Sequence, residues 1–277
     1  MLRLEHLITF TVLGTLLCAV LAWAASKIDR IWNHDNLPPD VRLRRKGLDL
    51  ALAGRPEEAE KYFRGSLILA DSSHRVRSLV CLADALMDQG RLEEAKEHLT
   101  CALELGDETA SGPTSMADLL LLAGTDPEQA LAMADEALNV LPHRSVSAYF
   151  SLEVSHQLWQ ATFWAQRARA LAQLDRREDA EQAVDQALQL AAAAEADAQR
   201  NKFRAPYNTR VILGSRRLAS GRDTRIAYVH WHIGLALLAI DDSERAADHF
   251  RVTRNTDRRG KYRNLAHQQL KRLEPQL

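Results

Sequence analysis

Small residues recur along this chain at intervals close to the length of a helix-turn-helix unit. One set follows five turn positions and consists of Ala59, Ala95, Ala130, Ala180 and Ala246, which are separated by 36, 35, 50 and 66 residues. A second set lies seven positions before each turn residue and consists of Gly47, Ala83, Ala117, Ala168 and Gly234. The distance between two packed helices depends on the side chains at their contact. The two sets therefore predict five close crossings between paired antiparallel helices.

The residues around these positions have the pattern of amphipathic helices. Four and seven residues after each alanine come Phe63 and Ser66, Leu99 and Ala102, Ala134 and Ala137, Val184 and Ala187, and Phe250 and Thr253. This spacing places one stripe of each second helix against a core. Gly54, Gly90 and Gly124 mark the first three turns, and Asp175 and Asp241 mark the last two. No alternating strand pattern is present, so we expect an all-α fold.

These residues resemble the tetratricopeptide repeat family, whose unit is about 34 residues of helix-turn-helix. The resemblance implies an α-solenoid over residues 40–258. Its units lie near 40–73, 76–108, 111–143, 161–193 and 227–258, with an extra helix at 145–160, a degenerate unit at 194–222 around Pro206, and a C-terminal cap helix at 259–277.

In that family the first helices of successive units line a groove that takes peptides. The resemblance places Arg44, Arg77, Asp84, Asp88, Asp118, Arg169 and Trp231 on this groove. Each of them has a plainer interpretation as a solvated surface residue. Leu48 and Cys81 stand where the family's chaperone-binding subgroup has carboxylate-clamping asparagines, which disfavours a co-chaperone of that type.

The termini carry further predictions. After a short tail at 1–6, residues 7–25 contain no charged side chain and match the length of a transmembrane helix, followed by a linker at 26–39. Lys27, Arg30 and further basic residues after this segment favour a cytoplasmic over a periplasmic C-terminal body by the positive-inside rule. Ala22-Trp23-Ala24 also fits a signal-peptide cleavage site, so an exported chain stays open.

The charges nearly cancel overall, at a formal net charge of -1, but they are unevenly placed. Residues 47–199 hold 12 basic and 26 acidic side chains, whereas residues 200–277 hold 17 basic and 7 acidic ones. The overall balance disfavours nucleic acid as a partner. The basic C-terminal third nevertheless leaves open a polyanion-binding module. Its basic residues before the last unit are Arg200, Lys202, Arg204, Arg210, Arg216, Arg217, Arg222 and Arg225, and those after the core of that unit are Arg251, Arg254, Arg258, Arg259, Lys261 and Arg263.

The sequence offers little for catalysis. It contains no GxxxxGK[ST], GxGxxG, HExxH or GxSxG motif, so we expect a non-enzymatic protein without a cofactor. His230 and His232 are two residues apart, which on a helix turns them about 200° from one another. This geometry disfavours a shared metal ion, and we expect no metal site.

Together these features predict a single-pass protein of the bacterial inner membrane that acts as a tetratricopeptide scaffold or assembly factor. Its expected partners are proteins of a membrane complex, the lipid bilayer through residues 7–25, and a second copy of the chain as a further candidate. The two alternatives are a periplasmic assembly factor with a cleaved signal peptide and the polyanion-binding module.

Overall fold

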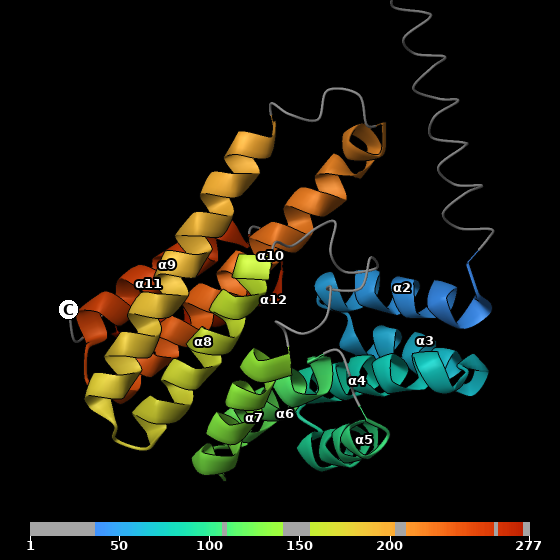
Figure 1. Cartoon of the computed structure of the whole chain (residues 1–277), viewed down its shortest axis with the longest axis horizontal. Coiled ribbons are helices and arrows are strands. Elements are labelled where there is room, and N and C mark those ends of the chain that lie inside the picture. Colours follow the sequence, from blue (N-terminus) through green and yellow to red (C-terminus); the bar gives the residue numbers. More distant parts are fainter. Residues whose placement is uncertain (1–36, 107–109, 141–155, 203–208, 258–259, 274–277) are drawn as a thin grey trace, which may run out of the picture.

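The computed structural model describes residues 37–106, 110–140, 156–202, 209–257 and 260–273. All regular secondary structure in these ranges is helical: α2 (Pro39–Leu52), α3 (Pro56–Leu69), α4 (Ser72–Asp88), α5 (Leu92–Glu104), α6 (Ser111–Ala123), α7 (Pro127–Val140), α8 (His156–Gln173), α9 (Arg177–Lys202), α10 (Thr209–Ala239), α11 (Ser243–Thr256) and α12 (Lys261–Leu273). The first ten form five antiparallel pairs in chain order, and α12 closes the series. Helices α2 to α5 lie at one side of the molecule and α8 to α12 at the other, with α6 and α7 between them (Figure 1).

Each pair reverses direction at a residue in the left-handed backbone region. Gly54, Gly90 and Gly124 have φ angles of 73°, 77° and 64°, and Asp175 and Asp241 have 58° and 64°. Glycine adopts this conformation without steric penalty, and aspartate tolerates it better than most residues. All five second helices then begin with an acidic residue in the first turn, which suits the positive end of the helix dipole.

The small residues of both sets are buried within the helix pairs. None of the eight alanines exposes any surface, and Gly47 and Gly234 are buried as well. The two glycines accept aromatic rings: a Cβ atom built on Gly47 would lie 2.5 Å from the Phe63 ring, and one on Gly234 would lie 2.6 Å from the Phe250 ring. The three pairs with alanine at this crossing have Leu99, Ala134 and Val184 in place of the phenylalanine. Where the first helix has glycine, the second helix thus supplies a larger side chain than it does opposite alanine, as close packing requires. We call this the exchange of volume between the two helices.

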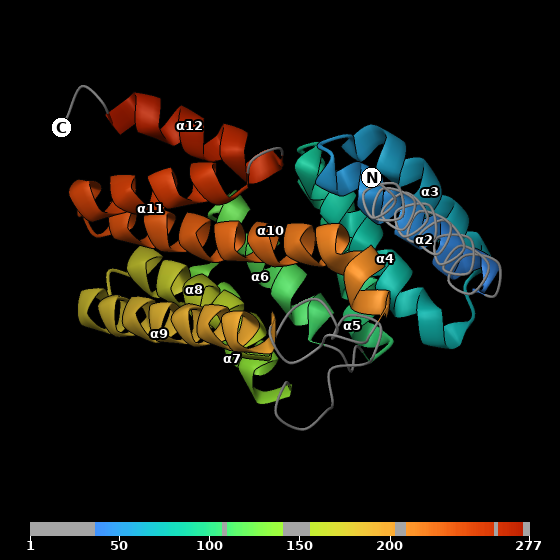
Figure 2. The same ribbon diagram turned by 90° about the horizontal axis from the view of Figure 1, so that it is seen from above.

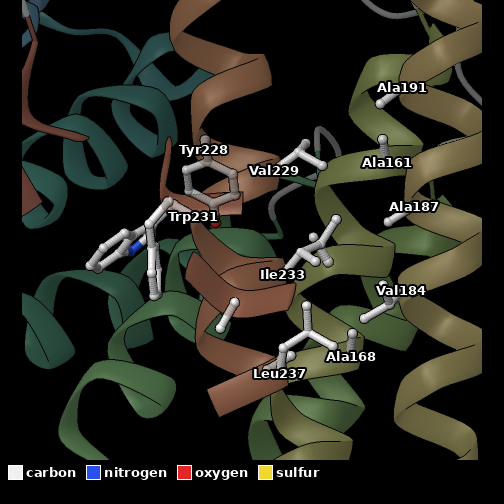
Figure 3. Close-up of a cluster of buried hydrophobic side chains, with 14 of the residues drawn as sticks. Ala161, Ala168, Val184, Ala187, Ala191, Tyr228, Val229, Trp231, Ile233 and Leu237 are labelled. Atoms are coloured by element: carbon white, nitrogen blue, oxygen red, sulfur yellow. The ribbon is translucent and has the colours of Figure 1, made fainter. Parts of the chain in front are cut away.

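Two large apolar clusters fill most of the stack among the described residues, one for each side of the molecule, and a third, small cluster consists of Ala110, Ala137 and Phe163. The first joins α3 to α8 and includes Phe63, Leu82, Leu86, Leu99 and Leu120. The second joins α8 to α12; within it Val229, Ile233 and Leu237 of α10 face alanines and Val184 on α8 and α9 (Figure 3). Leu131 on α7 packs against both clusters, so the two sides share a continuous apolar interior.

The region of the expected degenerate unit has a different construction. Helix α9 is 26 residues long and continues to Lys202, and α10 is 31 residues long and runs without interruption from Thr209 to Ala239. No helix ends at the expected boundary near residue 222. The long alanine interval of 66 residues therefore reflects two lengthened helices, because Ala191 to Ala194 favour helix extension and no proline lies between Pro142 and Pro206.

The predicted membrane localisation is wrong for the part of the chain that the structure describes. Among the described residues no helix combines the length and the apolar character needed to cross a membrane. Even the longest, α10, is interrupted by Arg216, Arg217 and Arg222. The predicted span at 7–25 and the cleavage site at Ala22-Trp23-Ala24 lie outside the described residues. The same holds for residues 145–155 of the expected extra helix, whereas residues 156–160 begin α8.

Candidate functional site

The first helices of the middle and last pairs bring polar side chains onto one face of the stack. We call this the first-helix face and define it by Asp84, Asp88, Asp118, Arg169 and Tyr228, which come from α4, α6, α8 and α10. Four of these five residues belong to the groove set predicted from the sequence, and Tyr228 does not. The face joins residues that are as many as 144 positions apart in the sequence.

Asp118 is the centre of a partly buried hydrogen-bond network on this face. The Tyr228 hydroxyl lies 2.5 Å and 2.6 Å from the two carboxylate oxygens of Asp118 and donates to that carboxylate. The Gln166 amide nitrogen donates to Asp118 Oδ1 at 2.7 Å, and it also contacts the Tyr228 oxygen at 2.8 Å and the Thr114 carbonyl at 2.9 Å. Helices α6, α8 and α10 are therefore tied together through a single carboxylate.

His232 completes the network from α10. Its Nε2 lies 3.4 Å from Asp118 Oδ1, and its ring lies 4.4 Å from that of Tyr228 between centroids. Burial lowers the pKa of His232 to about 4, although Asp118 opposes this shift. The imidazole is neutral at pH 7, and the proton is best placed on Nε2, facing the carboxylate. His232 Nδ1 and Gln166 Oε1 are buried and have no hydrogen-bond partner among the described residues.

Arg169 and Asp84 flank the network. The Arg169 guanidinium donates to the Leu121 carbonyl at 2.6 Å and so satisfies an acceptor in the last turn of α6. Burial lowers the pKa of Arg169, against the attraction of Asp118 and Tyr228. Burial also raises the pKa of Asp84 to about 6, although a hydrogen bond with Ser115 and the charge of Lys261 oppose this shift.

Asp88 pairs with a residue from the far end of the chain. Lys261, the first residue of α12, donates from Nζ to Asp88 Oδ1 at 2.7 Å. Burial alone would lower the pKa of Lys261, but Tyr262, Asp88 and Asp84 together raise it above its ordinary value. The Lys261 side chain therefore remains an ammonium ion against the acidic end of α4.

The other predicted groove residues have different positions. Arg44 is buried between α2 and α4, 3.7 Å from Asp40 and 3.4 Å from the Ser78 hydroxyl. Trp231 is buried and contacts Phe250, with 5.4 Å between ring centroids. Arg77 is half-buried on α4. Arg44 and Trp231 therefore pack in the interior of the stack. Neither is a solvated surface residue.

The two histidines beside Trp231 point to different neighbours. His230 Nδ1 lies 2.8 Å from His249 Nδ1 on α11, whereas His232 faces Asp118 on α6. This agrees with the angle expected for residues two apart on a helix. No group of three or more His, Cys, Asp and Glu side chains in the described part of the chain is arranged to hold a metal ion.

The basic C-terminal third is only partly described. The Arg225 guanidinium lies 4.0 Å from the centroid of the Trp159 ring, and Arg251 pairs with Asp248 at 2.6 Å. These two arginines thus have partners within the chain. The side chains of the dense cluster from Arg200 to Arg222 lie outside the described residues.

The chain consists of antiparallel helix pairs that reverse at left-handed turns and cross at buried small residues. The fold is that of a tetratricopeptide-like helical repeat. Similar solved structures include "MamA 41-end from Desulfovibrio magneticus RS-1", which is 16% identical, with 79% of this chain and 96% of that chain covered and a TM-score of 0.44. Another is a tetratricopeptide repeat protein from Parabacteroides merdae ATCC 43184, which is 18% identical, with 84% and 98% covered and a TM-score of 0.32.

A third similar structure is YrrB, described as a TPR protein with an unusual peptide-binding site. It is 14% identical, with 85% of this chain and 93% of that chain covered and a TM-score of 0.36. No family model matches the chain, and no curated protein matches it. The fold assignment therefore rests on the helix pairs themselves.

Proposed function

We propose that this protein is a non-enzymatic scaffold for protein–protein interactions and that it binds its partner through the first-helix face. The observation that carries the proposal is the proximity of four charged side chains from three first helices: Asp84 interacts electrostatically with Asp88 and Asp118, and Arg169 interacts with Asp118. Stacked helical repeats use extended surfaces of this kind for binding, because each repeat contributes a few side chains to a long face.

The chemistry of the face also favours binding over catalysis. Asp118 accepts hydrogen bonds from Tyr228 and Gln166, and the Arg169 guanidinium is committed to a main-chain carbonyl. These groups are held by structural contacts within the stack. Asp84 has a pKa of about 6, but its described neighbours are a serine hydroxyl, two carboxylates and Lys261, without a paired nucleophile and base among them.

The partner surface that fits this face is polar and carries positive charge. Asp84 and Asp88 lie one helical turn apart on α4, so both carboxylates are on the same side of that helix. The chain between residues 47 and 199 has 26 acidic and 12 basic side chains, which adds a negative long-range field. A basic protein segment is therefore favoured both on approach and in the bound state.

The test is capture with the full chain followed by a binary affinity measurement. A tagged wild-type chain is used to enrich proteins from the native source, and each enriched protein is purified and titrated calorimetrically against the wild type and against Asp84→Asn. The neutral amide keeps the shape of the aspartate and removes its charge. We expect the true partner to bind Asp84→Asn at least ten-fold more weakly.

Glu93→Gln is the matched control, because Glu93 is an exposed acidic residue on α5, a second helix of its pair. It removes the same charge from a different face, and we expect its affinity to equal that of the wild type. Equal weakening by both variants would indicate a general charge effect. If Asp84→Asn binds every enriched protein as tightly as the wild type, the first-helix face is not the binding surface.

A further inference from the structure

The contact between α12 and α4 joins the C-terminal helix to the second helix pair. Lys261 and Asp88 are 173 residues apart, and their side chains meet at 2.7 Å with 39% and 23% of their surface exposed. Figure 2 shows the start of α12 near the end of α4, while the rest of α12 lies along α11. We propose that α12 is an intramolecular latch that closes part of the first-helix face, and this proposal rests on the function proposed above.

The local sequence gives no helical reason for a lysine at this position. Lys261 is the first residue of α12, where a positive charge opposes the helix dipole. None of the first-turn residues of α12 is acidic. The Asp88 carboxylate on α4 compensates for this unfavourable position of the Lys261 charge. A lysine that is unfavourable within its own helix and favourable across the stack is the arrangement expected of a specific closing contact.

The backbone before α12 fixes where Lys261 points. Asp257 accepts from the Gly260 and Tyr262 main-chain nitrogens, each at 3.0 Å, so its carboxylate caps the start of the helix. The Tyr262 ring meets the Tyr228 ring edge-on, with centroids 5.7 Å apart at 85°. Tyr262 therefore anchors the first turn of α12 on α10 and directs Lys261 towards α4.

The latch lies beside the acids that a partner would use. Asp84 and Asp88 both attract the Lys261 ammonium group, and Tyr262 is close enough to Asp118 for the two to interact electrostatically. A lysine or arginine of a partner therefore competes with Lys261 for the same carboxylates. Every partner that binds through this part of the face must first displace the start of α12. Only a partner with its own cation replaces the lost contact between Lys261 and Asp88, so α12 lowers the affinity for partners without one.

Carboxyl labelling of the full-length protein tests the latch without a partner. A water-soluble carbodiimide with glycine ethyl ester modifies accessible carboxylates, and mass spectrometry gives the rate at Asp84 and at Asp118. Lys261→Glu removes the ion pair and places two like charges together. We expect both aspartates to label about five-fold faster in this variant, the factor that corresponds to an ion pair of about 1 kcal/mol.

Two further variants separate the latch from general effects. Lys271→Glu makes the same charge change at an exposed position of the same helix and is expected to label like the wild type. Lys261→Glu combined with Asp88→Lys reverses the pair and is expected to restore slow labelling of Asp84. Asp40 reports on folding, because it is 3% exposed in the folded chain and labels quickly only when α2 and α4 separate.

Two results would refute the latch. In the first, Asp84 and Asp118 label no faster in Lys261→Glu than in Lys271→Glu, while Asp40 stays protected. Failure of the reversed pair to slow the labelling of Asp84 refutes it as well. Neither result bears on the scaffold, which is tested by the affinity of Asp84→Asn for its partner. Weakened partner binding together with unchanged labelling would leave the scaffold in place and remove the latch.

Discussion

The exchange of volume at the helix crossings makes a quantitative prediction at Gly47. In the wild type, the Phe63 ring of α3 occupies the space above Gly47 of α2, and only 1% of Phe63 is exposed. Gly47→Ala would place a Cβ atom 2.5 Å, 2.7 Å and 2.9 Å from three ring carbons of Phe63. Ordinary contacts between carbon atoms are about 3.5–4.0 Å. The ring must therefore shift, and its burial leaves it no route to solvent.

Two opposing terms set the size of the effect. Replacing glycine by alanine inside a helix contributes about 1 kcal/mol of stability, because the unfolded chain loses conformational freedom. Overpacking a tight core typically costs about 1–3 kcal/mol. Three contacts under 3.0 Å place Gly47 in the upper part of that range, at about 2–3 kcal/mol, so we expect a net loss of about 1–2 kcal/mol in the free energy of unfolding. Gly65→Ala in the same helix pair is the control, because the nearest atom to its added Cβ is the tip of Leu43 at 3.2 Å.

A compensating change distinguishes a crossing effect from a general one. The second pair combines Ala83 with Leu99 at the corresponding positions. Gly47→Ala with Phe63→Leu recreates that combination and should recover at least about 1 kcal/mol relative to the sum of the single variants. Urea denaturation followed by circular dichroism measures all four free energies. If Gly47→Ala stabilises the protein as much as Gly65→Ala does, or if the double variant shows no coupling, the volume-exchange argument is wrong.

Three further predictions concern the network, its pH dependence and a helix cap. Tyr228→Phe should lower stability by about 1–3 kcal/mol, because the half-buried Asp118 carboxylate loses a donor; unchanged urea denaturation would contradict this. As pH falls from 6.5 towards 4, the unfolded chain protonates His232 while the folded chain excludes that proton, so this group lowers stability by about 3 kcal/mol. Asp84 largely offsets this loss, because its raised pKa makes the folded chain bind a proton before the unfolded chain does. His232→Gln should therefore be more stable at pH 4.5 relative to pH 7 than the wild type is, as denaturation at the two pH values would show. Asp242→Ala should cost about 1 kcal/mol, because Asp242 caps α11 by accepting from the Arg245 nitrogen at 3.1 Å; an unchanged thermal midpoint would rule that contribution out.

The sequence predicts the helix pairs well because their determinants are local. A turn residue, an alanine five or six positions later and an apolar stripe all lie within one unit, so each unit can be recognised alone. The long helices α9 and α10 show where this reasoning fails. A long interval between two alanines is compatible with an extra helix pair or with longer helices, and the spacing alone does not distinguish them. The choice depends on the local helix-forming residues before Pro206 and on the packing of α10 against α8.

The candidate site is predicted less completely, because register decides which side of a helix a residue occupies. Arg44 and Trp231 occupy groove positions by analogy, yet Arg44 is neutralised by Asp40 one turn earlier and Trp231 packs on Phe250. Tyr228 and His232, one turn apart on α10, face Asp118 instead. A tyrosine and a histidine spaced four apart on one helix were the available signal for this network.

Lys261 could not be assigned from the local pattern at all, since its partner is 173 residues away. The position of Asp88 relative to α12 depends on every helix crossing between them, because each crossing adds a small rotation to the stack. The sizes of the small residues therefore act on the site from a distance. A crossing that is opened by one overpacked side chain would change the separation of α4 and α12 and weaken the Lys261–Asp88 contact. The packing residues thus set the helix geometry on which the proposed binding face depends.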